Sequence, residues 1–297
     1  MKYQIRQSKA DTVFGVINAA LLGFVILIVL YPLVFILSAS FSDPVAVMSG
    51  RVWLWPISPT LKGYSAVFSN NSIVASYINS IIYTVAGTLV NVCVTIMAAY
   101  PLSRKELYGR NVFMFLFSFT MLFSGGMIPS YLLVRGLKLI DTRWALIIPV
   151  ALGVWDLIIT RTYLQSNIPQ ELYEAAEIDG AGDFRVLVQI VLPLSTPILA
   201  VITLFYAIRH WNSYFDALLY LKSMRLFPLQ LTLRNILILN TVDLSMLTDV
   251  EEIAQRQGIA ELLKYSLIVV ASAPVLLIYP FVQKYFIKGI MIGSLKG

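Results

Sequence analysis

Long segments of this chain contain no charged residue, and they limit what it can fold into. They include residues 12–42, 63–103, 111–134 and 265–283, and most of their residues are apolar. A run of about 18 or more such residues predicts a helix that crosses a membrane. Only 13% of the 297 residues are charged, whereas soluble domains average about 25%. The sequence therefore predicts an all-α integral membrane protein.

Six membrane-spanning helices fit this pattern, within a single transmembrane domain over residues 1–297. The expected spans are 13–38, 77–101, 112–134, 143–163, 195–220 and 265–286. Asp156 interrupts the fourth span, and Arg209, His210 and Asp216 interrupt the fifth. An even number of spans places both termini on the same side of the membrane.

Basic residues around the first two spans set the expected orientation. Lys2, Arg6 and Lys9 precede the first span, and three further basic residues follow the second. Loops rich in Lys and Arg stay in the cytoplasm, so we expect both termini and the loop at 164–194 to be cytoplasmic. The later loops nearly cancel in charge, so this prediction depends on the first two spans.

The net charge and the rare residue types exclude several classes of function. The charge of +6 comes from basic residues that lie mostly between the apolar runs, where they set topology or meet lipid headgroups, so we expect no nucleic-acid partner. The single Cys93 excludes an intrachain disulfide, and the single histidine argues against a metal site. No phosphate loop (G-x-x-x-x-G-K-S/T), nucleophile elbow or dinucleotide fingerprint occurs. We therefore expect no enzymatic activity and no cofactor in this chain, and a pump would draw on a partner or an ion gradient.

One acidic segment, "ELYEAAEIDGAGDFRVLVQIVLP", interrupts the apolar sequence and contains five carboxylates. Pro169 before it suits a first helical turn, and Gly180 within it suits a C-terminal stop. The pattern predicts a short helix over 169–179. Its first turn is expected to be capped by Ser166 or Asn167.

A second short helix, "FRVLVQIVL", is expected to follow after a sharp turn, with Asp183 as its cap and Pro193 at its end. The first helix has an acidic stripe of Glu171, Glu174 and Glu177 beside small and apolar residues. Helices that lie on anionic lipid favour Lys and Arg on their polar face, which this stripe does not provide. We therefore expect the two helices to dock in a basic groove of a partner protein, with a solvated loop as the alternative.

The same segment resembles the EAA loop of the inner-membrane permease subunits of binding-protein-dependent ABC importers. The matching residues are Glu174-Ala175-Ala176, Asp179-Gly180-Ala181 and Ile190-x-Leu192-Pro193. Elsewhere "FSGGMIPSYLLV", "WALIIPV", "VLPLSTPILA" and "HWNSYFDALLYL" are similar to the carbohydrate-uptake branch, in particular its maltose-permease G-type subunits. The tail "KYFIKGIMIGSLKG" looks like that of the lipoprotein-linked or complex-oligosaccharide members, and the similarity extends from about residue 30 to the end.

The resemblance implies a type I ABC importer fold and an assembly in a bacterial cytoplasmic membrane. The other parts would be a second, homologous permease, two ATPase subunits that hold ATP and magnesium, and an extracytoplasmic solute-binding protein that delivers a sugar or oligosaccharide. The acidic segment would couple closure of the ATPases to alternating access, and the tail after Lys284 would also reach them. The residues implied in coupling are Glu174, Ala175, Ala176, Asp179, Gly180, Ala181, Ile190, Leu192 and Pro193.

A second set of residues is a candidate lining for the substrate pathway. Its members are Gly125, Gly126, Pro129, Arg209, His210, Trp211, Asn212, Tyr214 and Asp216. Aromatic rings, amides and carboxylates suit sugar binding, and a charge inside a membrane costs roughly 3 kcal/mol, which favours a functional role. Arg209 and Asp216, seven residues apart, would share one helix face. The alternatives are that Arg209 pairs with an acid of the second permease, and that Trp211 and Tyr214 serve packing.

Two further patterns lie in the third and fourth spans. Gly125, Gly126 and Pro129 predict a break that lines a cavity or acts as a hinge, and the alternative is close helix packing through small residues. Asp156 and Arg161 are expected to form a local or intersubunit ion pair.

Two other classes of function compete with the permease. A stand-alone ion-coupled secondary transporter often has broken helices in both halves, whereas the sequence contains one clear break, and the acidic segment would have no purpose there. A membrane-embedded enzyme is disfavoured because no nucleophile–base set or metal cluster occurs. We therefore expect a permease subunit.

Overall fold

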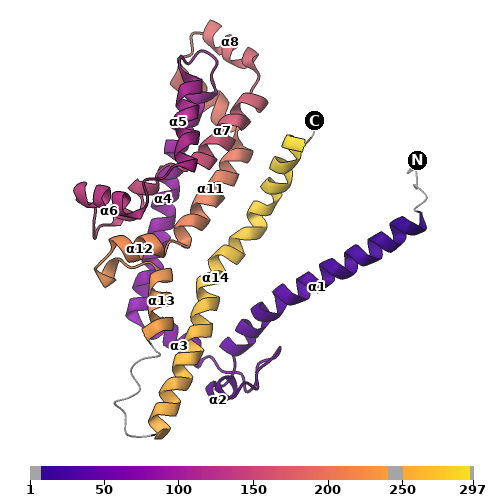
Figure 1. Cartoon of the computed structure of the whole chain (residues 1–297), viewed down its shortest axis with the longest axis vertical. Helices are drawn as coiled ribbons and strands as arrows, with labels where there is room; N and C mark the ends of the chain where they lie inside the picture. Colours follow the sequence, from indigo (N-terminus) through magenta and orange to yellow (C-terminus); the bar gives the residue numbers. More distant parts are fainter. Residues whose placement is uncertain (1–7, 240–249, 295–297) are drawn as a thin grey trace. The chain divides into compact units, whose positions relative to one another are not determined.

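The computed structural model is helical throughout its regular elements (Figure 1). The residues it describes are 8–239 and 250–294, with side chains for 8–237 and 258–280. Its internal contacts define two compact units, formed by Met1–Asn70 with Ile236–Val270 and by Asn71–Asn235 with Ala271–Gly297. The expected contact of the tail after Lys284 with ATPases falls on side chains outside the described residues.

The first unit contains α1 (Lys9–Ser40), α2 (Pro44–Met48), α3 (Lys62–Ser69) and the N-terminal part of α14 (Val250–Ser294). A capping box starts α1, because the side chains of Ser8 and Asp11 each accept the backbone N–H of the other residue. Small residues allow close packing within the unit. Ala39 is fully buried, and a Cβ at Gly63 would clash with Ser266 of α14. Most other side chains of α1 are exposed and apolar, as suits a helix surrounded by lipid.

The second unit is built around one long helix, α4 (Asn71–Ser103). The other elements wholly or partly in this unit are α5 (Arg110–Leu122), α6 (Met127–Gly136), η1 (Arg143–Leu146), η2 (Ile148–Val150), α7 (Val154–Asn167), α8 (Gln170–Ile178), α9 (Asp183–Val186), η3 (Leu187–Val191), α10 (Leu192–Leu194), α11 (Thr196–Trp211), α12 (Phe215–Tyr220), η4 (Met224–Leu226), α13 (Leu229–Leu239) and the rest of α14. Helices α7 and α11 pack directly on α4.

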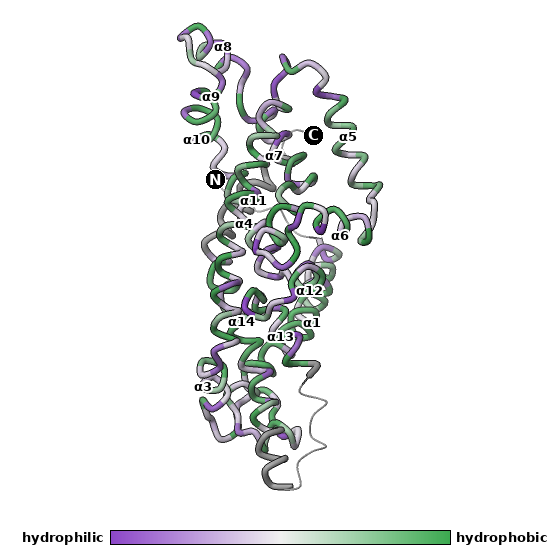
Figure 2. Tube along the Cα trace, turned by 90° about the vertical axis from the view of Figure 1, so that its left-hand side faces the viewer, coloured by the Kyte–Doolittle hydropathy of each residue, from purple (hydrophilic) through white to green (hydrophobic). Residues whose placement is uncertain are grey.

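Three helices are long and apolar enough to cross a membrane by length and composition, namely α1, α4 and the Gly258–Pro280 part of α14. Three pairs of shorter helices pass the same test but are bent at a short break. If each bent pair counts as one span, the described residues contain up to six. Figure 2 shows the hydrophobic character of α5, the first helix of one bent pair.

The break expected in the third span is present. Residues 112–134 are divided between α5 and α6, which are bent by 115°. Gly126 adopts a φ of 84°, a backbone conformation that side chains rarely allow, and Pro129 lies in the first turn of α6, where a proline is tolerated. The two residue types therefore account for the sharp bend.

The fourth and fifth spans differ from the expected continuous helices. Residues 143–150 form the two 3-10 turns η1 and η2, and the chain then bends by 49° into α7. Helix α11 ends at Trp211 instead of continuing to residue 220. The Asn212 backbone N–H and Nδ2 both donate to the Ile208 carbonyl at 3.0 Å, and the next N–H, that of Ser213, turns to the His210 carbonyl at 3.2 Å, which ends the α-helical pattern.

Helix α4 presents a buried row of polar side chains to its neighbours. This row, called the polar seam below, consists of Ser76, Asn79, Ser80, Asn91 and Thr95. Buried polar groups need hydrogen-bond partners, and the upstream half of the seam finds them beyond α12. Asn79 Nδ2 donates to the Arg225 carbonyl at 2.7 Å, and Ser80 Oγ accepts the Leu229 N–H at 2.8 Å. These bonds fix the segment around η4 against α4.

The downstream half of the seam binds α11 and η2. Asn91 Oδ1 lies 2.9 Å from His210 Nε2, and Asn91 Nδ2 donates to the Val150 carbonyl at 2.5 Å. Thr95 Oγ1 lies 2.7 Å from the Tyr206 hydroxyl. The seam thus joins elements that are distant in sequence, in a part of the chain that is otherwise apolar.

A single carboxylate closes the loop between α6 and η1. Asp141 accepts the backbone N–H groups of Lys222 and Ser223 at 2.9 and 2.8 Å and the Ser223 hydroxyl at 2.5 Å, while its own N–H donates to the Tyr220 carbonyl. The Ser223 and Lys222 bonds lower the pKa of Asp141 from 3.8 to about 2. The charged form of Asp141 therefore holds the segment after α12 in place.

We expect the Asp141 charge to stabilise the protein in a defined pH range. Because its folded pKa is depressed, the contribution is complete above the unfolded pKa of 3.8 and disappears as the pH falls through about 2. Asp141→Asn keeps one acceptor oxygen and tolerates the positive φ of 58°, so it removes mainly the charge. Thermal unfolding in detergent should show a lower midpoint for Asp141→Asn above pH 3.8, with the difference from the unmodified protein closing near pH 2. A difference independent of pH would contradict this assignment.

Candidate coupling elbow and substrate pathway

The acidic segment folds into two short helical stretches joined at a turn, as expected. This elbow comprises α8, α9, η3 and α10, residues 170–194. Gly180 follows α8 with a φ of 70°, and its N–H donates to the Glu177 carbonyl at 3.0 Å. A left-handed residue after the last helical turn is a common helix stop, so the glycine does what its position predicts.

The caps of both stretches differ from the expectation. Pro169 occupies the N-cap of α8 without a side-chain bond. Ser166 Oγ bonds back to the Thr162 carbonyl at 3.0 Å and is thereby used within α7. The second stretch starts after Gly182, and Asp183 is its first residue but makes no cap bond.

The second stretch is α-helical only at its ends. Residues Leu187–Val191 form a π-helical turn, and a bend of 84° at Ser195 leads into α11. Pro193 lies inside α10, where it lacks the N–H that a regular helix would donate. Wide turns of this kind occur often at functional sites.

The elbow has a buried face and an exposed face. Tyr173, Ala176, Val186 and Val191 belong to a core cluster with residues of α4 and α7. The remaining predicted coupling residues point outward or are partly exposed. Those are Glu174, Ala175, Asp179, Gly180, Ala181, Ile190, Leu192 and Pro193. Of the two consecutive alanines, only Ala176 therefore packs inward.

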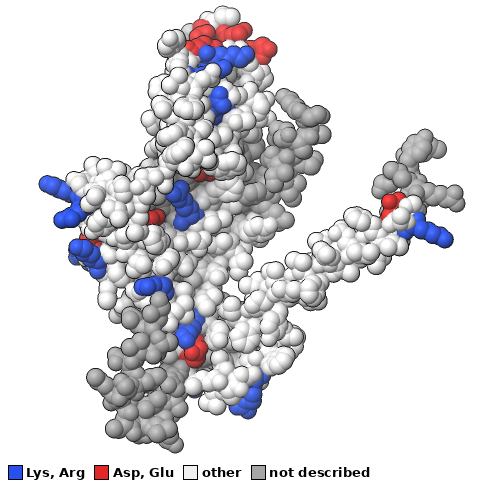
Figure 3. Space-filling view, viewed as in Figure 1, with Lys and Arg blue, Asp and Glu red and all other residues white. Residues whose placement is uncertain are grey.

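The exposed face of α8 combines acidic and apolar side chains. Glu171, Glu174 and Glu177 are exposed, and Ile178 beside them is 87% exposed. Figure 3 shows acidic residues gathered at this end of the second unit, with basic residues next to them. Complementary charges favour the association of two protein surfaces, so the acidic face suits docking on a basic partner groove.

A stacked arginine fastens the base of α8. The Arg104 guanidinium lies 3.8 Å from the centre of the Tyr173 ring and pairs with Glu106 at 3.3 Å. Gln170 Nε2 donates to the same carboxylate at 2.9 Å. Burial raises the pKa of Tyr173, although the Arg104 charge opposes this effect, so the phenol stays neutral. These contacts tie α8 to the loop after α4.

The candidate pathway residues on α11 divide into buried and exposed ones. His210 is buried against Asn91. Trp211 is buried too, donates Nε1–H to the Ala271 carbonyl at 2.9 Å and meets the Tyr77 ring edge-on. Arg209, Asn212 and Tyr214 are exposed.

The expected common face of Arg209 and Asp216 is not formed. Asp216 belongs to α12, which is separated from α11 by a non-helical break. The charge of Arg209 instead acts on Asp156, a residue that is 9% exposed and whose carboxylate bonds to the Tyr206 hydroxyl. Arg161 Nε donates to the Leu102 carbonyl at 3.0 Å rather than to Asp156.

The Gly125-Gly126 break is exposed at the surface of the chain. Gly125, Gly126 and Pro129 are all exposed, and nothing lies within 4 Å of a Cβ built at Gly126. Among the described residues, a Cβ at Gly125 would meet only the nearby Pro129, so the two glycines do not serve close packing against a distant helix. Among the described side chains, no group of three His, Cys, Asp or Glu residues is placed to hold a metal ion.

Two features of the site were not expected from the sequence. One is the pairing of Asn91 with His210, and the other is the stack of Arg104 on Tyr173. An asparagine within an apolar run signals a partner, but a single sequence does not say which one. From the sequence, Arg104 indicated only how the spans are oriented in the membrane.

The sequence is similar to a known family and to characterised relatives. The family described as binding-protein-dependent transport system inner membrane component matches residues 91–292. The polygalacturonan/rhamnogalacturonan transport system permease protein YtcP of Bacillus subtilis is 44% identical over 93% of this chain and 96% of its own length. Protein LplC of the same bacterium is 41% identical over 99% of both chains.

A solved structure agrees with the sequence relatives. One chain in the crystal structure of a bacterial ABC transporter involved in the import of the acidic polysaccharide alginate matches with a TM-score of 0.86 and 37% identity, over 95% of this chain and 100% of that one. This match identifies the all-helical fold as that of a type I ABC permease. The chain belongs to the family of inner-membrane components of binding-protein-dependent transport systems, as the EAA-like residues predicted.

Proposed function

We propose that this permease forms half of a transmembrane pathway for a sugar or oligosaccharide, and that its elbow transmits motion from a separate ATPase. The observation that carries the proposal is the construction of α8. Its acidic face is exposed, whereas Tyr173 and Ala176 fix its other face to α4 and α7. A rigidly anchored helix with a free charged surface can pass a push from a docked partner to the spanning helices.

The proposed assembly contains three kinds of partner. A second, homologous permease completes the pathway, two ATPase subunits bind ATP and magnesium, and an extracytoplasmic solute-binding protein delivers the substrate. The elbow faces the cytoplasm, and so do both termini. The basic residues Arg104, Lys105 and Arg110 beside the elbow support this orientation, because such residues collect on the cytoplasmic side.

Acidic oligosaccharides are the first substrates to test. The names of YtcP and of the alginate transporter refer to polygalacturonan, rhamnogalacturonan and alginate. The exposed guanidinium of Arg209 suits a carboxylate-bearing sugar. Asn212 and Tyr214 beside it offer an amide and an aromatic ring, while the buried His210 and Trp211 support the helix in this conformation. Pairing of Arg209 with an acid of the second permease is the alternative.

Reconstitution tests the function directly. The chain is purified with its partner permease, ATPases and solute-binding protein and reconstituted in proteoliposomes. ATP is supplied on the side of the membrane where the ATPases lie. We expect uptake of labelled oligogalacturonate that stops when the phosphate loop of the ATPase is inactivated. Uptake by this chain alone, driven by a proton or sodium gradient, would show a stand-alone secondary transporter instead.

A further inference from the structure

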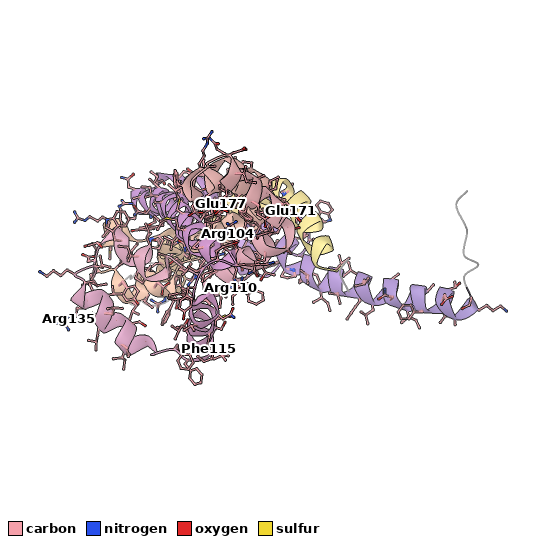
Figure 4. All side chains as sticks on the ribbon, turned by 90° about the horizontal axis from the view of Figure 1, so that it is seen from above. Arg104, Arg110, Phe115, Arg135, Glu171 and Glu177 are labelled. Carbon is pink, nitrogen blue, oxygen red and sulfur yellow. The ribbon has the colours of Figure 1, made fainter. Side chains whose placement is uncertain are left out.

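A polar cavity of about 320 Å³ lies at the base of α8. Four segments enclose it: the loop after α4, the first turn of α5, the end of α7 and the start of α8. The lining residues with polar heads include Arg104, Lys105, Arg110, Gln165 and Gln170. Figure 4 labels Arg104 and Arg110 on adjoining segments below the Glu171 and Glu177 of α8.

The cavity has an excess of positive charge. Three of its lining residues are cations, and none is a carboxylate. The neighbouring Glu106 already pairs with Arg104 and accepts from Gln170. Arg104 Nη1 is buried and has no hydrogen-bond partner among the described groups. A buried guanidinium nitrogen without an acceptor costs free energy, so the site is incomplete without an anion.

Two helix N-termini also open onto the cavity. Helix α5 starts at Arg110 and α8 at Gln170, and both residues line the cavity. Neither N-cap residue, Gly109 or Pro169, supplies a side-chain cap. The exposed N–H groups and the dipole of a helix N-terminus attract anions, phosphate in particular. The helix ends and the cations therefore favour the same kind of ligand.

The surroundings of the cavity indicate where a phosphate would come from. The cavity lies directly after Ser103, the last residue of an apolar span, which is the depth of lipid headgroups. Helix α5 then leads away with exposed apolar side chains, among them Val112, Phe113 and Leu116. Such a surface suits acyl chains.

We propose that this cavity binds the phosphate group of an anionic phospholipid headgroup, with the acyl chains lying against α5. Bound there, the lipid bridges the loop after α4 to the base of the elbow. The lipid then stabilises the position of α8 from which coupling starts. This inference goes beyond the proposed transport function and needs no particular substrate.

Lipid retention in the complete complex tests the proposal. The complex is stripped of lipid, and native mass spectrometry then follows its titration with phosphatidylglycerol or with phosphatidylcholine. We expect phosphatidylglycerol to bind preferentially, and Lys105→Gln/Arg110→Gln to bind it roughly tenfold more weakly, since each cation near a headgroup contributes to affinity. Arg135→Gln is the matched control, because it removes one positive charge from α6, outside the cavity (Figure 4). Lys105→Gln alone, at an exposed position, guards against misfolding of the double variant.

Other outcomes separate the possible occupants. Inorganic phosphate that binds at the same cations by calorimetry, with no retained phosphatidylglycerol, would keep the phosphate site and overturn the lipid as its source. Equal binding of phosphatidylglycerol by the double variant and the control would overturn the site. Carbodiimide cross-linking of Lys105 to a carboxylate of the ATPase would do the same, because the cavity would then hold a protein side chain. None of these readouts requires transport, so the proposal can fail while the transport function stands.

Discussion

Replacing Gly180 with proline is expected to abolish ATP-driven uptake while the solute-binding protein keeps its affinity for ligand. Gly180 has a φ of 70°, whereas proline fixes φ at about −65°. Proline also lacks the N–H that Gly180 donates to the Glu177 carbonyl. The end of α8 would therefore unwind, and the elbow would no longer present its acidic face to the ATPase. Uptake into proteoliposomes and ligand titration of the binding protein measure the two effects.

Gly182→Ala is the matched control for this experiment. Gly182 lies two residues further along the same turn, has a φ of −72°, and nothing lies within 4 Å of a Cβ built on it. It should transport normally. Glu174→Lys is a second variant that leaves the backbone unchanged, because Glu174 is exposed, and it should also lose transport through repulsion from a basic groove. Normal uptake by both Gly180→Pro and Glu174→Lys would refute the coupling role of the elbow.

Replacing Gly87 of α4 with alanine is expected to lower the stability of the folded protein. A Cβ at this position would overlap His210 Nε2 and would lie 2.5 and 2.7 Å from its Cε1 and Cδ2 atoms. The imidazole has little freedom to move, because Asn91 holds it and its surroundings are buried. Overpacking of this kind costs about 1–3 kcal/mol. The thermal unfolding midpoint in detergent should fall by several degrees.

Two further variants test whether the His210 ring causes the expected loss of stability in Gly87→Ala. Gly136→Ala, in α6 with nothing within 4 Å of the added Cβ, is the control and should unfold near the unmodified protein. His210→Ala removes the obstacle, so adding it to Gly87→Ala should cost less than the sum of the two single changes. Additive losses, or a Gly87→Ala midpoint equal to that of Gly136→Ala, would show that the two residues are not in contact.

Local signals in the sequence were sufficient for some elements. Uncharged runs located α1, α4 and the apolar part of α14, because a helix in lipid needs little more than length and hydropathy. Pro169 and Gly180 located α8, since both act on the backbone next to them. Gly126 and Pro129 predicted the bend between α5 and α6 for the same reason.

Other features depend on partners that the sequence does not name. Ser166 does not cap α8 because it lies inside α7, which extends to Asn167, whereas α8 starts only at Gln170. The early end of α11 comes where the Ser213 N–H turns to the His210 carbonyl, and the 3-10 turns before α7 accompany a bond from Asn91 to Val150. Asn91 and His210 are 119 residues apart, so neither residue alone indicates the contact.

The polar seam has a mechanical consequence. Separating α4 from α11 would break the Asn91–His210 and Thr95–Tyr206 hydrogen bonds in an apolar environment, and each polar group left unsatisfied there costs several kcal/mol. The two helices therefore move as one rigid body in any opening or closing of the pathway. We expect the chain to bend where such hydrogen bonds are absent. The exposed bend at Gly125-Gly126 is one such place. The seam thus confines bending to segments outside the α4–α11 pair.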